Sequence, residues 1–269
     1  MSKYITKFET EAAYQTALPS LDLPNVSLVT QTNEVHYHRL SWGGVAGDIL
    51  VYDVQEAQKL LVKYADWNLT SYPTASYPII GIVVADESAA GLTVMSNFGL
   101  AADGSKTTDT DTSRLKWQNI QTMDWGLTKY TSGVDAKTDF NGKANTTAII
   151  NAIKAYDTAN NTDNITGNIG GAIQAFVTEG TVAGDWYVGS EGELYKVYEN
   201  KTAIKAAADK IYNANSTLGM NGNTLLSNTY FWSSSEASRF DAWKTYIFDG
   251  NVSQYTKNES YRVNALLRV

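Results

Sequence analysis

The last forty residues of the chain carry the clearest alternation of apolar and polar positions. Apolar or β-branched residues recur at every second place in two runs: Trp243, Thr245 and Ile247, then Val263, Ala265, Leu267 and Val269. A period of two predicts strands with one buried face. A turn between strands is indicated after the first run by Asp249-Gly250-Asn251. We expect the opposite face of these strands to carry Lys244, Tyr246, Phe248, Asn264 and Leu266.

Other patterns predict a mixture of strands and helices. Residues 78–84 form a nearly continuous apolar run, which indicates a strand buried on both faces, with residues 92–95 as its neighbour. Residues 48–52 predict a further strand. Apolar residues at helical spacing predict helices over residues 54–64, 146–156, 173–177 and 203–211. The fold class expected from these elements is α+β.

The first forty residues are expected to form a small module of their own. Residues 8–18 predict a short helix that Pro19 ends, and residues 26–29 and 35–38 predict two strands. We therefore expect a helix and hairpin module over residues 1–40, and the main domain over residues 41–269.

Composition narrows the class of partner. The chain has 269 residues, with 21 Lys and Arg, 28 Asp and Glu, and a formal net charge of -7. Nucleic acid is not an expected partner, because phosphate binding needs a basic surface. The absence of cysteine excludes disulfides, a thiol nucleophile and thiolate metal ligands. Residues 1–8 lack the apolar segment of a signal peptide and no apolar run could span a bilayer, so no membrane partner is expected.

Candidate metal and catalytic residues are few. His36 and His38 share one face of a predicted strand, but no clear carboxylate partner stands near them. Asp109 and Asp111 have the spacing of a calcium loop without its glycine and distal glutamate. Neither a Gly-x-Ser-x-Gly elbow nor a His-Glu-x-x-His motif is present. We expect no metal, no other cofactor and no enzymatic activity.

The C-terminal tail resembles a known family. The motifs are Phe231-Trp232-Ser233-Ser234-Ser235-Glu236, Ala242-Trp243, Gly250-Asn251-Val252, Lys257, and Arg262-Val263 followed by Ala265. Upstream, Trp186-Tyr187-Val188-Gly189-Ser190 is similar too, with Val-Gly in place of the family's Leu-Pro. In this order the motifs resemble variable proteins of diversity-generating retroelements and related non-variable bacterial surface proteins. The resemblance implies a C-type lectin-like fold over residues 41–269, with a variable-type region over residues 230–269.

The resemblance also implies which residues contact a ligand. Family diversification replaces template adenines, mostly in Asn-type codons, which cannot yield Lys, Glu, Gln, Trp or Met. Trp232, Glu236, Trp243 and Lys257 are therefore expected as scaffold. Tyr, Ser, Asn and Arg are typical of binding surfaces. The expected ligand-binding residues are Ala237, Ser238, Arg239, Phe240, Asp241, Lys244, Tyr246, Phe248, Asp249, Ser253, Tyr255, Asn258, Ser260 and Asn264. Lys244 lies where the family often varies but does not fit the codon rule.

The implied function is a ligand- or receptor-binding protein that displays a hypervariable-type surface on a C-type lectin scaffold, encoded by a phage or prophage. Its expected partner is a macromolecular ligand on a bacterial surface. Its expected location is a virion, the cell surface or the extracellular space. Residues 8–14 and 25–29 resemble the leading segment of structural proteins of phages that infect gut bacteria. That resemblance implies that residues 1–40 dock to a virion or to further copies of the chain.

Three alternatives stay open. A bacterial surface adhesin of fixed sequence would carry the same tail. Formylglycine-generating oxidases resemble this fold, but they need cysteine, which the chain lacks. Calcium-dependent sugar lectins resemble it as well, but their Glu-Pro-Asn or Gln-Pro-Asp and Trp-Asn-Asp motifs are not present. A nearby reverse transcriptase gene and an imperfect repeat of the tail's coding sequence would favour the variable protein.

Overall fold

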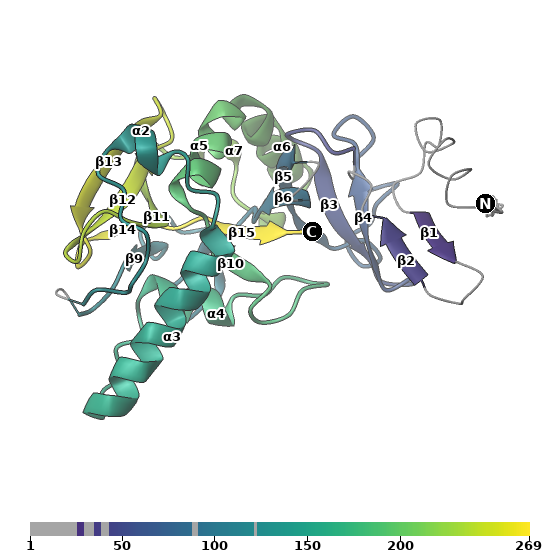
Figure 1. Cartoon of the computed structure of the whole chain (residues 1–269). Coiled ribbons are helices and arrows are strands. Elements are labelled where there is room, and N and C mark those ends of the chain that lie inside the picture. The colour runs from purple at the N-terminus through teal and green to yellow at the C-terminus, as the bar shows by residue number, and fades with distance from the viewer. Residues whose placement is uncertain (1–25, 30–34, 39–42, 88–90, 121–122) are drawn as a thin grey trace.

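The computed structural model describes residues 26–29, 35–38, 43–87, 91–120 and 123–269. Its largest sheet has six strands in the order β10-β15-β6-β5-β3-β4, with each neighbouring pair antiparallel. These strands are β3 (Ile49–Asp53), β4 (Gln58–Val62), β5 (Ile79–Glu87), β6 (Gly91–Met95), β10 (Trp186–Val188) and β15 (Ala265–Arg268). Figure 1 shows β15, near the end of the chain, beside β10 in the middle of the molecule.

Apolar side chains on both sides of the central strands explain why this sheet is buried. Ile80 and Val83 of β5 face one apolar cluster, while Ile82 and Val84 face a second one. All four side chains are fully buried. The strands expected over residues 48–52, 78–84 and 92–95 are thus confirmed, and so is burial of both faces.

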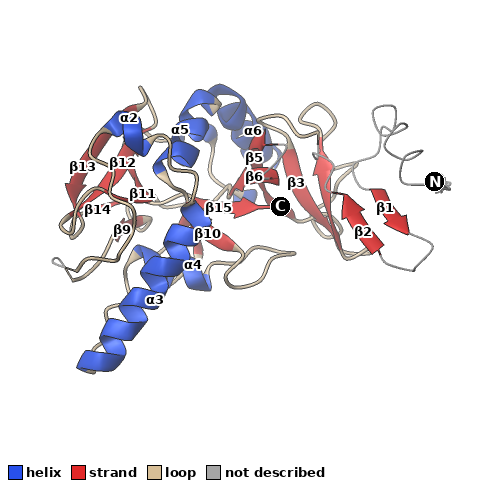
Figure 2. Ribbon diagram, viewed as in Figure 1, coloured by secondary structure: helices blue, strands red, loops and turns tan. Residues whose placement is uncertain are grey.

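Helices cover both faces of the six-stranded sheet. Those that pack on one face are α3 (Gly142–Asn160) and α4 (Ile169–Ala175). Those on the other face are α5 (Glu191–Glu199), α6 (Lys201–Ala214) and α7 (Gly222–Leu225). Two further short elements in the described residues are α2 (Gly133–Ala136) and a 3-10 turn (Ser216–Leu218). Figure 2 shows these two groups of helices on opposite sides of β15 and β10. The helices expected over residues 146–156 and 203–211 are confirmed.

A second sheet has five strands in the order β13-β12-β11-β14-β9. The strands are β9 (Arg114–Lys116), β11 (Tyr230–Glu236), β12 (Asp241–Tyr246), β13 (Asn251–Thr256) and β14 (Ser260–Arg262). Only the β11 and β14 pair is parallel. Trp243, Thr245 and Ile247 are buried on one side of this sheet, as the alternation predicted.

Two small hairpins complete the described strands. β1 (Val26–Val29) pairs with β2 (Val35–His38), and β7 (Gly99–Leu100) pairs with β8 (Lys106–Thr107). The first pair confirms the two predicted N-terminal strands, whereas the helix predicted over residues 8–18 lies outside the described residues. Figure 1 shows the β1 and β2 hairpin at the end of the molecule opposite β12 and β13. The structure is therefore an α+β fold with mainly antiparallel sheets.

Two expectations about strands of the six-stranded sheet were wrong. Residues 54–64 do not form a helix, because Asp53 and Gln58 close a tight hairpin in which β4 extends the large sheet. The Asp53 carboxylate accepts from two backbone N–H groups of that turn, and pairing with β3 outweighs local helical spacing. Leu266 does not lie on an open face. It is fully buried because β15 lies between β10 and β6, with core on both sides.

Candidate ligand-binding face

Five aromatic side chains lie on one face of the five-stranded sheet, and we call them the aromatic patch. They are Tyr230, Tyr246, Phe248, Tyr255 and Tyr261. Their ring centroids form a continuous series, with separations of 6.1 Å from Phe248 to Tyr246, 5.0 Å from Tyr246 to Tyr230, 5.9 Å from Tyr230 to Tyr261 and 5.9 Å from Tyr261 to Tyr255. These separations suit edge-to-face and tilted aromatic pairs.

Strand register explains how residues far apart in sequence reach one face. Tyr230 of β11 lies directly opposite Tyr246 of β12, and side chains of directly opposed residues share a face. Tyr255 of β13 lies opposite Ala242 of β12, two residues from Lys244. Trp232 forms the floor of the patch, with its ring edge-to-face to Tyr261 at 4.9 Å. Trp232 is fully buried, so it fixes the strands that carry the exposed rings.

Lys244 lies at the centre of the patch. The expectation that Lys244 lies on an exposed surface is corrected. The residue is only 5% exposed, because Tyr230, Tyr255 and Tyr261 surround its ammonium. The distance from Nζ to the ring centroid is 3.8 Å for Tyr230, 4.1 Å for Tyr261 and 4.5 Å for Tyr255. All three lie within the range of cation–π attraction. Lys244 therefore holds the tyrosines together from beneath.

Two loops meet at one end of the sheet. Residues 237–240 connect β11 to β12, and residues 257–259 connect β13 to β14. The backbone N–H of Lys257 donates to the Phe240 carbonyl at 3.0 Å, which joins the loops. Arg239 stacks over the Phe240 ring at 4.6 Å, and Ser238 accepts from the Asp241 backbone N–H. Five of the fourteen expected ligand-binding residues lie on these loops: Ala237, Ser238, Arg239, Phe240 and Asn258.

The turn between β12 and β13 lies at the other end of the sheet. Phe248 is 65% exposed there, and Lys201 of α6 donates to its carbonyl oxygen. Gly250 adopts a φ of +78°, and a Cβ at this position would overlap the ring of Tyr198. Asp249 accepts from the Asn251 backbone N–H at 2.8 Å. The predicted turn is thus confirmed, and it presents Phe248 and Asp249 to solvent.

The expected ligand-binding residues divide into three groups by accessibility. Those that are exposed are Arg239, Phe240, Phe248, Asp249, Tyr255 and Ser260. Those that are partly exposed are Ala237, Ser238, Asp241, Tyr246, Ser253 and Asn258. Those that are buried are Lys244 and Asn264.

The expectation that Asn264 contacts a ligand directly is corrected. Asn264 is 1% exposed, because it joins β14 to the central strand β15 in the interior. Sequence reasoning also missed Tyr230 and Tyr261, which belong to the patch. Tyr230 joins the patch because β11 pairs with β12 and Tyr230 lies opposite Tyr246, and no local stretch of sequence specifies this pairing.

The four expected scaffold residues are all buried. Glu236 and Lys257 form an ion pair between two fully buried side chains. Each tryptophan donates its indole N–H to a backbone carbonyl, Trp232 to Glu259 at 3.3 Å and Trp243 to Tyr130 at 3.1 Å. These contacts connect the strands to the loops on which the exposed residues lie.

A buried carboxyl group lies on the opposite side of the same sheet. Glu191 begins α5, and the hydroxyl of Thr245 in β12 donates to its Oε1 atom. Its Oε2 atom has no hydrogen-bond partner among the described residues. Burial raises the pKa of Glu191 to about 7. The protonation of this carboxyl therefore changes near neutral pH.

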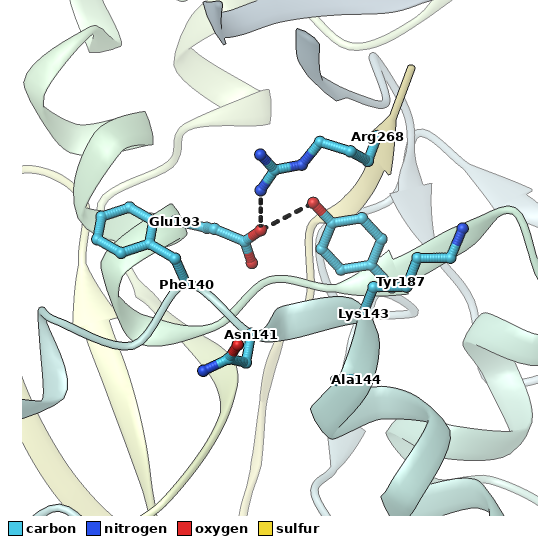
Figure 3. Close-up of a pocket in the computed structure, with 7 residues that line it drawn as sticks. All are labelled: Phe140, Asn141, Lys143, Ala144, Tyr187, Glu193 and Arg268. Atoms are coloured by element: carbon cyan, nitrogen blue, oxygen red, sulfur yellow. Dashed lines mark hydrogen bonds and ion pairs between the residues drawn. The ribbon is translucent and has the colours of Figure 1, made fainter. Parts of the chain in front are cut away.

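A pocket of about 260 Å³ lies away from the patch, between the start of α3, β10, α5 and β15. Figure 3 shows Tyr187 and Arg268 converging on the Glu193 carboxylate. The distances to Glu193 Oε1 are 2.9 Å from the Tyr187 hydroxyl and 2.6 Å from Arg268. Glu193 Oε2 accepts from the backbone N–H and hydroxyl of Ser190 in the capping box of α5. Both oxygens of Glu193 thus stabilise the fold.

Across the described ranges, no group of three or more His, Cys, Asp or Glu residues is placed to hold a metal ion. Within those same ranges, no helix combines the length and apolarity that crossing a bilayer requires.

Comparisons with known proteins find little. No family model and no curated protein matches the chain. Among solved structures, a fimbrial protein from Bacteroides ovatus is similar over 84% of this chain, with 16% sequence identity and a TM-score of 0.41. The chain spans 49% of the length of that protein. At this TM-score the similarity does not establish a shared fold.

Proposed function

We propose that the chain is a surface-displayed binding protein that recognises a macromolecular ligand through the aromatic patch and the adjoining loops. The observation that carries the proposal is a continuous series of rings, part of which is open to solvent, above a buried tryptophan floor. Large exposed aromatic surface is uncommon on soluble proteins without a partner. Rigid aromatic side chains also dominate binding energies, since little entropy is lost when they are ordered.

The test is binding of the labelled chain to a panel of intact bacterial cells. The double variant Tyr246→Ala with Phe248→Ala should bind roughly 30-fold more weakly or worse, which corresponds to about 2 kcal/mol. Val45→Ala and Val182→Ala are matched controls, because both valines are exposed apolar residues outside the five-stranded sheet. Unchanged cell binding by the double variant, with its fold intact, would reject the proposal.

Two forms of this function are proposed, and one observation separates them. The tail motifs support a C-type lectin-like variable protein of a diversity-generating retroelement. Lys244 favours a fixed-sequence surface adhesin, because its ammonium is enclosed by three tyrosines and its codon does not fit adenine diversification. Sequencing the gene from many cells of one population distinguishes the two forms. Variation confined to codons 237–264 supports the first form, and an invariant tail supports the second.

The N-terminal module is proposed to attach the chain to a virion or to further copies of itself. The β1 and β2 hairpin lies at the end of the molecule opposite β12 and β13, so attachment there would leave the aromatic patch free (Figure 1). Deleting residues 1–38 should leave the main domain folded and abolish assembly, as measured by light scattering and by incorporation into particles. Loss of the whole fold on deletion would instead indicate one integrated core.

A further inference from the structure

Lys244 differs from the other buried cations of its sheet. Lys257 pairs with Glu236, and Arg262 donates to the Ser113 hydroxyl at 3.0 Å and the Ser227 hydroxyl at 2.7 Å. The Lys244 ammonium, in contrast, makes no hydrogen bond or ion pair with any described residue. In the described part of the chain, the contacts that stabilise its charge are with the faces of three tyrosine rings. A buried charge normally has an acceptor, so the missing acceptor requires an explanation.

The ammonium of Lys244 is not completely shielded from solvent. Lys244 Nζ is not among the fully enclosed polar atoms without a partner in the described part of the chain. Burial lowers the pKa of Lys244, and no carboxylate opposes this effect. A ligand carboxylate above Nζ would supply both the acceptor and the counter-charge.

The surroundings of Lys244 indicate a ligand that is rich in hydroxyl groups. Within the described residues, the hydroxyls of Tyr230, Tyr255 and Tyr261 make no hydrogen bond, whereas that of Tyr246 donates to Asn228. Each free phenol can donate one hydrogen bond and accept others. The outer faces of the rings offer flat apolar area against which the C–H face of a sugar ring can stack. A saccharide provides both types of contact.

Charge limits how acidic that saccharide can be. Asp241, Asp249 and Glu259 lie at the two ends of the sheet, and the chain has a formal net charge of -7. A strongly anionic peptide would be repelled by these carboxylates. Phosphate groups are usually bound by arginine forks or by several cations together, and this patch offers a single ammonium. A single carboxylate on the sugar ring at the site fits one lysine.

We propose that Lys244, with Tyr230, Tyr255 and Tyr261, binds the carboxylate of an acidic sugar residue, of the uronic acid class, within a surface polysaccharide. This inference rests on the proposed binding function of the aromatic patch and names the chemistry of its ligand. The carboxylate lies over the ammonium, the sugar hydroxyls pair with the phenols, and the ring stacks on the exposed tyrosines.

The test compares an oligogalacturonate with its methyl ester by isothermal titration calorimetry. The ester keeps every ring and hydroxyl and replaces each carboxylate by a neutral methyl ester. Because a hydrogen bond to a charged group contributes about 1.5–3 kcal/mol, the ester should bind roughly tenfold more weakly or worse. Lys244→Met should weaken binding of the acid to the level of the ester, and Lys244→Arg should retain most of the affinity. Lys210→Met is the matched control, because Lys210 also stacks over a tyrosine, Tyr64, but lies on α6.

Three outcomes would overturn the inference. Equal affinity for acid and ester would make Lys244 only a support for the rings. Unchanged binding of the acid by Lys244→Met, with the fold verified by circular dichroism, would place the carboxylate elsewhere. Binding of a tri-aspartate peptide that depends on Lys244, with no binding of the oligogalacturonate, would assign the site to peptides.

Failure of this inference can be separated from failure of the proposed function. If Tyr246→Ala with Phe248→Ala abolishes cell binding while the oligogalacturonate does not bind, the patch is a binding surface for a different ligand. If that double variant binds cells like the unmodified chain, the proposed function itself is rejected.

Discussion

The two large sheets differ in the kind of side chain that they bury. Apolar side chains cover both faces of the central strands of the six-stranded sheet. Charged pairs such as Glu193 with Arg268 lie at its margin. The five-stranded sheet buries Glu236, Lys257 and Arg262, together with a run of serines at residues 233–235. Hydrophobic burial is strong but non-directional, whereas hydrogen bonds and ion pairs depend on geometry.

This difference suggests a division of roles. The apolar sheet contributes most of the stabilisation, because its strands are buried on both faces. The polar contacts of the five-stranded sheet fix positions instead: Trp117 donates to the Ser233 carbonyl at 2.7 Å, and Ser233 donates to the Trp243 carbonyl at 2.8 Å. Buried polar groups without partners are costly, so such networks favour one register over its alternatives. A fixed register sets the spacing of the aromatic patch.

The largest expected effect tests whether the five-stranded sheet shares one cooperative core with the six-stranded sheet. Trp232→Ala removes a fully buried ring that packs in the same apolar cluster as Leu50 and Val94 of the large sheet. We expect a loss of about 3–5 kcal/mol in the free energy of unfolding, measured by urea denaturation, in one transition. Two separate transitions, or a loss below about 1 kcal/mol, would mean that the sheets unfold independently.

The next effect concerns the buried carboxyl between the two sheets. The Glu191 carboxyl has a pKa of about 7 in the folded chain and an ordinary value of 4.5 when exposed. As pH rises from 4.5 to 7, the unfolded chain loses this proton while the folded chain retains it. Stability therefore falls with rising pH across this window, by about 3 kcal/mol in total, and levels off above it.

Glu191→Gln should remove most of this pH dependence. The variant should be more stable than the unmodified chain at pH 8 and similar to it at pH 5, as measured by denaturation at both values. Asp163→Asn is a control on an exposed carboxyl. The same slope of stability against pH in Glu191→Gln and the unmodified chain would show that another group is responsible.

The sequence was sufficient where one local pattern decides the structure. The alternation at Trp243, Thr245 and Ile247 predicted a strand and its buried face, and the apolar run at residues 78–84 predicted a strand with two buried faces. Prediction from the sequence failed where pairing with a strand distant in sequence decides the structure. Residues 54–64 carry helical spacing, but pairing with β3 makes residues 58–62 a strand.

The candidate site was predicted in part for the same reason. Tyr246 and Phe248 could be placed on an outer face from strand alternation alone. Lys244 follows the same alternation, yet three tyrosines from neighbouring strands bury it. Tyr230 and Tyr261 join the patch only through register, and Asn264 is buried because β15 enters the six-stranded sheet. Cross-strand neighbours are not encoded within one stretch of sequence.

A smaller effect tests close packing in the apolar sheet. A Cβ at Gly81 of β5 would lie 2.4 Å from the Met95 carbonyl oxygen and 2.8 Å from Val94 Cγ1. We expect Gly81→Ala to cost about 1–3 kcal/mol of unfolding free energy, because the neighbouring strand must shift. Gly170→Ala is the matched control in α4, where the nearest atom would be 3.3 Å away and alanine favours the helix. Equal stability of the two variants would show that β5 and β6 separate easily.

The smallest effect on stability should come from the aromatic patch itself. Phe248 is 65% exposed and its ring centroid lies 6.1 Å from that of Tyr246, so its removal leaves no cavity in either core. Phe248→Ala should change the free energy of unfolding by less than about 0.5 kcal/mol, while it weakens cell binding by about 1 kcal/mol or more. Val182→Ala, at an exposed apolar residue outside both sheets, should change neither quantity. A stability loss for Phe248→Ala like that of Trp232→Ala would show that the Phe248 ring supports the fold. It would also remove the contrast between the six-stranded sheet, which stabilises the fold, and the five-stranded sheet, which exposes the aromatic patch.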